Sequence, residues 1–153
     1  ERPGVVAATA AVGGTNQHAA AGGRCDARVP VLQVHGVDDP CWAYETRTAA
    51  CAFLEEGRKV GVDDTLAAWR TRDGCGATAS DEALPDAAPD GTRALRRTWA
   101  GCAAPVVHLR VEGGGHTWPG GHQYLDADTV GRVSRDFNAS EEIVRFFDAN
   151  PRR

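Results

Sequence analysis

The sequence contains no methionine and only one lysine, Lys59, among its 153 residues. Because an initiator methionine is missing, we expect that processing or cropping has removed an N-terminal part. The 153 residues also lack the apolar core of a secretory signal peptide and any apolar stretch of membrane-spanning length. We therefore expect no membrane association, with any targeting peptide in the part that would precede Glu1.

An excess of positive charge is absent as well. The chain has 21 acidic and 17 basic residues, which gives a formal net charge of −4 and a sequence pI near 5.7. The only tight basic cluster is Arg93, Arg96 and Arg97, which we interpret as the solvated face of a strand. A nucleic-acid partner is therefore not expected.

The five cysteines include no C-x-x-C pair, so the spacing typical of zinc sites is missing. Disulfides in an exported protein are the better interpretation of so many cysteines in a chain of this length. An odd number leaves one cysteine over, and a partner outside these residues would account for it. The five are Cys25, Cys41, Cys51, Cys75 and Cys102.

Four apolar runs have the composition of β-strands. Residues 5–12 and 29–34 are short and almost continuously apolar, which favours strands buried on both faces, although a buried helix is an alternative for the first run. Residues 95–99 and 106–111 are joined by a short link, which predicts antiparallel neighbours. Polar residues alternate with apolar ones in the last run, so we expect His108 on a solvated surface.

Two helices have recognisable ends. The first is predicted to begin at the N-cap pair Asp63 and Asp64 and to end at Gly74. The second is predicted to begin at Asn138, a good N-cap, and to stop before Pro151.

Two further segments are less regular. Residues 46–56 fit a helix within an ambiguous stretch, and residues 76–92 are rich in Asp, Ala, Pro and Gly, which is typical of an exposed connection. The chain length and its 42% hydrophobic content predict one globular domain over residues 1–153.

Residues 113–121 (GGGHTWPGG) are the first candidate for chemistry. Glycines allow a chain leaving a strand to turn sharply, so His116 can be presented at the tip of a loop. Histidine exchanges protons near neutral pH. The alternative is an ordinary loop with an incidental histidine.

An acidic turn at residues 37–40 is the second candidate, because it follows the predicted strand 29–34. Open α/β sheets hold their ligands beyond the carboxyl ends of their strands. A turn or helix cap is the alternative for this motif. Together, Asp39 and His116 have the chemistry of a charge relay, in which a carboxylate orients an imidazole that deprotonates a nucleophile.

A metal site is a weaker alternative, because the spacing of its ligands fits no helical or finger pattern and glycine loops hold ligands poorly. We expect neither a metal nor a cofactor. The four candidate ligands would be His116, His122, Asp126 and Asp128.

Two segments carry a resemblance to a known family. Residues 31–40 (VLQVHGVDDP) and 111–121 (VEGGGHTWPGG) resemble the carboxyl-terminal half of the secreted polyhydroxybutyrate depolymerase and feruloyl esterase family of α/β-hydrolases. The glycine-histidine-tryptophan motif is fairly specific, whereas the His-Gly-x-x-Asp turn is common across α/β-hydrolases. The resemblance extends along most of the chain, through residues 63–75, 99–102, 123–125, 131–132, 134–136 and 146–147.

The resemblance implies roles for particular residues. By position, Asp39 matches the triad acid and His116 the triad base, with Asp38 as the acid if the register of the turn differs by one. The Gly-Cys pairs of the family imply a disulfide between Cys75 and Cys102.

The chain departs from this family at the nucleophile. α/β-Hydrolases carry it on a G-x-S-x-G elbow that precedes the acid, and no such elbow is present here. The three serines, Ser80, Ser134 and Ser140, all follow the acid. In the family, a cysteine at the position of Cys25 can pair with one on the nucleophile helix, which is also missing. The resemblance places the oxyanion-hole donors in the same missing half.

These observations predict a partial α/β-hydrolase fold. It would hold the last three parallel strands and an antiparallel extended segment, flanked by helices, without the N-terminal half that carries the nucleophile elbow. Residues 5–12 would then form an uncovered apolar edge, which predicts instability or association unless the missing half is supplied.

The function implied by the resemblance is that of an exported serine carboxylester hydrolase working through an acyl-enzyme. Its substrates would be hydroxyalkanoate polyesters or their oligomers, or feruloyl or acetyl-xylan-type esters of plant cell walls. Trp118 either lines the substrate pocket or packs the loop onto the fold. The chain alone is expected to be inactive. A non-catalytic fragment or a binding domain with an aromatic ligand loop is the alternative.

Overall fold

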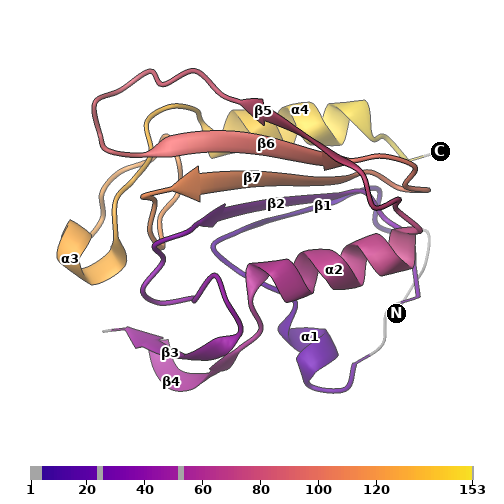
Figure 1. Ribbon diagram of the computed structural model, residues 1–153, viewed down its shortest axis with the longest axis horizontal. Helices are drawn as coiled ribbons and strands as arrows, with labels where there is room; N and C mark the ends of the chain where they lie inside the picture. Colours follow the sequence, from indigo (N-terminus) through magenta and orange to yellow (C-terminus); the bar gives the residue numbers. More distant parts are fainter. Residues whose placement is uncertain (1–4, 24–25, 52–53, 153) are drawn as a thin grey trace.

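The structure, a computed structural model, describes residues 5–23, 26–51 and 54–152. Strands and helices are mixed along the chain, with two runs of three consecutive strands (Figure 1). In chain order they are β1 (Thr9–Val12), α1 (Gln17–Ala20), β2 (Val31–Gly36), β3 (Arg47–Cys51), β4 (Leu54–Lys59), α2 (Val62–Asp73), β5 (Ala79–Ala83), β6 (Arg93–Trp99), β7 (Val106–Glu112), α3 (Ala127–Val130) and α4 (Ala139–Ala149).

A five-stranded mixed sheet forms the centre of the fold, with strand order β1-β2-β7-β6-β5. The strands β1, β2 and β7 are parallel, and β6 and β5 continue the sheet in antiparallel fashion. This architecture is compatible with the predicted α/β class. It also contains the expected three parallel strands and their antiparallel neighbour.

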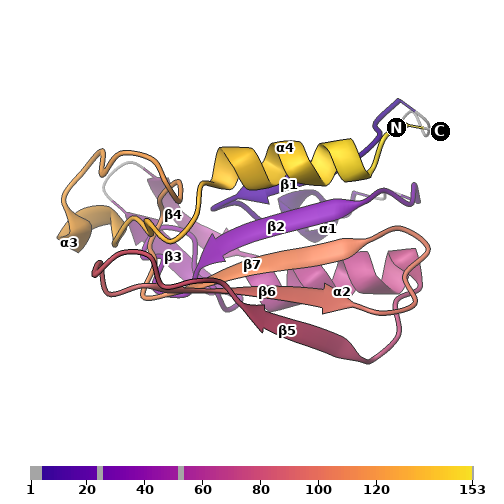
Figure 2. The ribbon, with the colours of Figure 1, turned by 90° about the horizontal axis from the view of Figure 1, so that it is seen from above.

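A helix covers each face of the sheet, α4 on one side and α2 on the other (Figures 1 and 2). On the α4 side, Leu32 of β2 and Leu109 of β7 pack with Phe146. On the α2 side, Val106 of β7 packs with Leu66. Burial on both faces explains why residues 29–34, which contain β2, read as an almost continuous apolar run.

Strand β1 forms one edge of the sheet, because β2 is its only partner strand among the described residues. Val5 and Val6, which precede it, are 61% and 54% exposed. β1 therefore covers only residues 9–12 of the strand predicted over residues 5–12. The predicted position of this strand at an edge of the sheet is confirmed. An open edge presents backbone groups that can pair with another chain segment.

The sequence correctly predicts where α2 stops and where α4 begins. Gly74 takes the left-handed conformation, with φ of 64°, that closes α2. The side chain of Asn138 accepts hydrogen bonds from the backbone N–H groups of Ser140 and Glu141 at the start of α4. The predicted N-cap of α2 is wrong by a few residues, because Gly61 occupies the N-cap position. The two aspartates lie in the first turn, where their negative charge interacts favourably with the helix dipole.

A β-hairpin occupies the segment in which the sequence predicts a helix over residues 46–56. Strands β3 and β4 pair in antiparallel fashion, and a disulfide joins Cys51 at the end of β3 to Cys41. Helix propensity is a weak local preference, so the pairing and the cross-link override it. Residues 52–53 lie outside the described part of the chain.

The predicted connection over residues 76–92 also contains a strand, β5. All five of its residues are exposed, and it pairs with β6 along the second edge of the sheet. A bidentate ion pair between Asp81 and Arg97, with both N–O distances 2.7 Å, links the two strands. Arg96 is not on a fully solvated face as predicted, because it is partly buried and pairs with Glu142 of α4.

His108 is buried, which corrects the prediction of a surface histidine. It is 1% exposed because Tyr44 covers the α2 side of the sheet. Burial lowers the pKa of His108 to about 4, and burial likewise raises the pKa of Tyr44 to about 12. The neutral ring donates from Nδ1 to the Gln33 carbonyl and accepts at Nε2 from the Tyr44 hydroxyl, both at 2.9 Å. The alternating pattern indicated the correct face, but another part of the chain covers that face.

We expect Asp73→Asn to stabilise the protein at pH 8 and to have little effect at pH 4. Asp73, the last residue of α2, is fully buried, and burial raises its carboxyl pKa from 3.8 to about 6 despite the nearby Arg72 and Arg28. The folded state therefore binds this proton more tightly than the unfolded state, so stability falls as the pH rises from about 4 to about 6. Removing the charge should increase the free energy of unfolding by about 1–3 kcal/mol above pH 7. Urea unfolding at both pH values measures this, and an equal change at both would contradict it.

Candidate functional site

Three loops meet at the carboxyl edge of the parallel strands. They follow β1, β2 and β7, and backbone hydrogen bonds connect the first loop to strand β2 and the second loop to the third. The N–H of Gly13 donates to Val34 at 3.0 Å, and the N–H of Asp38 donates to Gly114 at 3.0 Å. Ligands of open α/β sheets bind at this edge, so the fold brings the two predicted catalytic residues to the expected place.

The turn after β2 holds the carboxylate of Asp39. Its Oδ1 atom accepts hydrogen bonds from the backbone N–H groups of Cys41, at 2.8 Å, and Trp42, at 2.7 Å. This is the turn geometry that aspartate favours, in which the side chain binds the backbone two or three residues further on. Asp39 is only 2% exposed, whereas Asp38 is exposed. The register of the turn thus directs Asp39 into the site.

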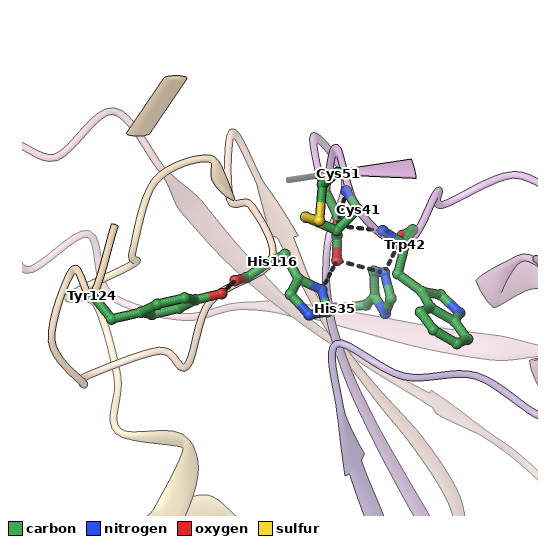
Figure 3. Close-up of a disulfide and its surroundings, with 7 residues drawn as sticks. His35, Cys41, Trp42, Cys51, His116 and Tyr124 are labelled. Carbon is green, nitrogen blue, oxygen red and sulfur yellow. Dashed lines mark hydrogen bonds and ion pairs between the residues drawn. A yellow bond between two sulfur atoms is a disulfide. The ribbon is translucent and has the colours of Figure 1, made fainter. Parts of the chain in front are cut away.

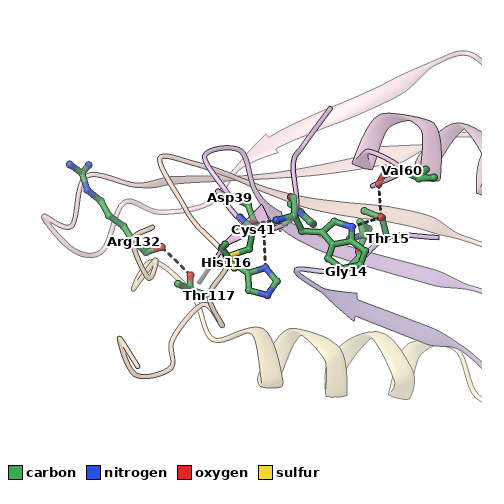
Figure 4. A network of polar contacts seen from close by, with 12 residues as sticks. Gly14, Thr15, Asp39, Cys41, Val60, His116, Thr117 and Arg132 are labelled. Atoms are coloured by element: carbon green, nitrogen blue, oxygen red, sulfur yellow. Dashed lines mark hydrogen bonds and ion pairs between the residues drawn. A yellow bond between two sulfur atoms is a disulfide. The ribbon is translucent and has the colours of Figure 1, made fainter. Parts of the chain in front are cut away.

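The loop after β7 brings His116 to this carboxylate. Nδ1 of His116 lies 2.9 Å from Oδ2 of Asp39, and the histidine side chain is 22% exposed (Figure 4). Because a carboxylate oxygen can only accept, Nδ1 carries the proton in this contact. The structure therefore joins the two residues that the sequence predicts as acid and base.

Glycines are required where the site loops pack together. A Cβ on Gly115 would lie 2.1 Å from the carbonyl oxygen of Val130, and one on Gly36 would lie 2.2 Å from the carbonyl oxygen of Gly114. Gly13, with φ of 67°, faces the ring of His116, which a Cβ there would meet at 3.3 Å. The glycine run therefore allows the close packing that fixes His116, in addition to the sharp turn predicted from the sequence.

The electrostatics of the site favour an ionised carboxylate. Burial by itself would raise the pKa of Asp39, but hydrogen bonds from His116, His35 and the backbone of Trp42 outweigh it and lower the pKa. Asp39 is therefore negatively charged at neutral pH. A negative charge beside Nδ1–H stabilises an imidazolium that forms when the other ring nitrogen takes up a proton.

A second histidine, His35, contacts the same carboxylate, although the sequence patterns assign it no role. Its Nε2 atom lies 3.3 Å from Oδ2 of Asp39 and 2.9 Å from the carbonyl oxygen of Trp42 (Figure 3). The feature of the sequence that could have indicated this contact is the position of His35, at the end of β2 and four residues before Asp39.

A small open pocket adjoins His116. Its volume is about 170 Å³, and Trp118 and Tyr124 contribute aromatic walls that are 44% and 52% exposed. The Tyr124 hydroxyl donates to the His116 carbonyl at 2.7 Å, and the Trp118 indole donates to Ser140 at 3.1 Å. Trp118 thus lines this pocket and also contacts the first turn of α4 through its indole N–H.

Two disulfides occur in the described part of the chain. One joins Cys75 and Cys102, the pair that the resemblance implies, and ties the end of α2 to the segment between β6 and β7. The other joins Cys41 and Cys51, beside Asp39. Cys25 lies outside the described residues.

The three serines are engaged in other contacts. Ser80 lies in the exposed strand β5, and Ser134 is buried and accepts from the Thr92 hydroxyl at 2.8 Å. Ser140, in the first turn of α4, accepts the Trp118 bond described above. Among the described residues, the chain contains no group of three or more His, Cys, Asp or Glu side chains that could hold a metal ion.

Within residues 5–23, 26–51 and 54–152, no helix has the length and apolar character needed to cross a membrane. The two disulfides are consistent with an extracellular protein, because such bonds persist in oxidising compartments.

Comparison with known proteins finds a relative that is named as an esterase. This chain is 32% identical over 157 residues to a protein of Nocardia uniformis subsp. tsuyamanensis named "Putative esterase NocK". The match covers 95% of this chain and 45% of that protein, so the chain spans less than half the length of this relative. No protein-family model matches the chain.

We expect Asp39→Ala to change the tautomer of His116. In the wild type, Asp39 holds the proton on Nδ1; without the carboxylate, the ring should return to the Nε2–H form that predominates in free histidine. Asp38→Ala is the matched control, because this neighbouring carboxylate is exposed, and it should leave the ring unchanged. Nitrogen-15 NMR of the histidine rings at pH 8 measures both variants. Equal effects of the two substitutions would contradict the geometry.

Proposed function

We propose that this chain supplies the acid and the base of a serine carboxylester hydrolase. Asp39 is the acid and His116 is the base, and the nucleophilic serine lies outside these 153 residues. The observation that carries the proposal is the 2.9 Å contact between His116 Nδ1 and Asp39 Oδ2 at the carboxyl edge of the parallel strands. This arrangement corresponds to two members of a Ser-His-Asp triad.

The proposed mechanism uses His116 twice. Nε2 first takes the proton from the serine hydroxyl as the oxygen attacks the ester carbonyl, and it then gives that proton to the leaving alcohol. Water attacks the resulting acyl-enzyme in the same way, with His116 as base and then as acid. Asp39 keeps the proton on Nδ1 and stabilises the imidazolium in both halves. The donors that stabilise the tetrahedral oxyanion are proposed to lie with the serine, outside this chain.

Similarity to a protein named as an esterase supports an ester as the substrate class. We further propose hydroxyalkanoate polyesters or oligomers, or feruloyl or acetyl-xylan-type esters, as the substrates, on the basis of the motifs around His116. Trp118 is the proposed substrate-binding residue, since it lines the pocket beside the base. No cofactor is needed for this chemistry.

Two disulfides support a proposal of export, because such bonds form and persist in oxidising compartments. We propose that the protein acts outside the cell.

A binding domain without catalysis is the second candidate, favoured by the exposed aromatic walls of the pocket. The reading frame that encodes these residues distinguishes the two proposals. A G-x-S-x-G segment there supports the hydrolase, whereas its absence supports the binding domain.

We expect the 153-residue chain to show no turnover of a p-nitrophenyl ester, because it contains a base but no nucleophile to activate. The product of the complete reading frame should be active, and His116→Ala should reduce its kcat/KM by about 10⁴-fold or more. His122→Ala, a change at an exposed histidine near the same loop, should leave kcat/KM unchanged. Turnover by the 153-residue chain that His116→Ala abolishes would overturn the proposed source of the nucleophile.

Trp118→Ala tests the pocket separately. In the active complete protein, loss of this aromatic wall should raise KM for an aromatic or long acyl ester more than for an acetyl ester, because a small acyl group buries little surface against the indole. Steady-state kinetics with both esters measures the difference. An equal effect on both esters would indicate that Trp118 acts only by packing the loop.

A further inference from the structure

We propose that His35 is a positioning residue for Asp39, holding the acid turn so that Oδ2 faces His116. The inference rests on the proposed acid–base role of Asp39 and His116. It concerns a contact that the proposed mechanism does not use. The Nε2–H group of His35 bridges the Asp39 carboxylate and the carbonyl oxygen of Trp42.

The carboxylate of Asp39 is held from both sides. The backbone N–H groups of Cys41 and Trp42 occupy Oδ1, and the rings of His35 and His116 both approach Oδ2. The two rings come from different strand ends, since His35 belongs to β2 and His116 follows β7. Figure 3 shows both rings in this arrangement. His35 is therefore placed to limit rotation of the carboxyl group away from His116.

His35 also holds the turn itself. Trp42 donates its N–H to Oδ1 of Asp39, and its carbonyl oxygen accepts from Nε2 of His35 at 2.9 Å. Because that carbonyl oxygen can only accept, Nε2 is the protonated nitrogen of His35. The contacts form a closed loop from Asp39 through Trp42 to His35 and back to Asp39. Loss of the imidazole would remove two sides of that loop.

The other nitrogen of His35 shows that this placement has an energetic cost. The residue is 1% exposed, and Nδ1 has no hydrogen-bond partner among the described residues. A buried polar atom without a partner costs about 1–3 kcal/mol, and each such atom in a native structure requires an explanation. An apolar side chain at this position would avoid the cost. The Nε2–H contacts with the acid turn provide the explanation.

The test compares His35→Phe with His108→Phe in protein labelled with nitrogen-15 in its histidine rings. His108 is the matched control, because it is a histidine with the same exposure of 1%. Its two ring nitrogens, however, form hydrogen bonds with Gln33 and Tyr44. His35→Phe should reduce the share of His116 that carries its proton on Nδ1 from the majority to a minority. His108→Phe should leave that share at the wild-type level even if it lowers thermal stability as much.

A second readout follows the Asp39 carboxyl group directly. Its pKa should rise in His35→Phe, because one of the hydrogen bonds that lower it is removed, and should stay unchanged in His108→Phe. Carbon-13 NMR of the carboxyl group measures the titration. Neither readout needs a nucleophile, so failure here leaves the proposed hydrolase untouched, and failure to find a serine leaves this result standing.

Two further variants keep the inference testable if His35→Phe does not fold. His35→Asn is smaller and its amide is too short to span both partners, so it should show the same two changes as His35→Phe. His35→Gln can present an N–H group at greater reach and should restore part of the wild-type signal. The inference is wrong if His35→Phe and His35→Asn leave His116 in its wild-type tautomer, or if His108→Phe changes it equally. It is also wrong if both His35 variants are unfolded under conditions in which His108→Phe is folded.

Discussion

The site depends on how one buried carboxylate is solvated by the protein. Burying a charged group without partners would be unfavourable by several kcal/mol, so Asp39 can stay ionised only if donors replace the lost water. Two backbone N–H groups and two imidazoles do so, and together they lower its pKa in spite of burial. The glycines and the backbone contacts of the site loops allow these donors to approach.

The sheet provides the donors because its parallel strands end at one edge. Gly36 ends β2 just before the acid turn, and the glycine run after β7 lets His116 approach from the neighbouring strand. Trp42 joins the same turn to the loop after β1, where its indole donates to Thr15 at 2.6 Å; Thr15 in turn donates to the Val60 carbonyl (Figure 4). Three loops that are distant in sequence thus hold Asp39 and His116 against each other. The end of the edge strand β1 lies next to the same two residues, because Gly13 faces the ring of His116.

Sequence patterns placed Asp39 and His116 at the same edge of the sheet because both positions depend on local features. A glycine run after an apolar strand, and an acidic turn after another, place Asp39 and His116 at strand ends whatever covers the sheet. The contacts of His35 and His108 could not be predicted from the sequence. His108 is buried by residues far along the chain, and His35 contacts a turn that folds back onto it. The hairpin of β3 and β4 was missed for the same reason. Its pairing and the Cys41–Cys51 disulfide override a local preference for helix.

Covalent labelling tests the central claim most directly, because it identifies the atom that His116 serves. The product of the complete reading frame would be treated with a fluorophosphonate, digested and examined by mass spectrometry. We predict a phosphonylated serine within a G-x-S-x-G segment outside these 153 residues, and no labelling when His116 is replaced by alanine. An adduct on Ser80, Ser134 or Ser140, or labelling that persists without His116, would contradict the account.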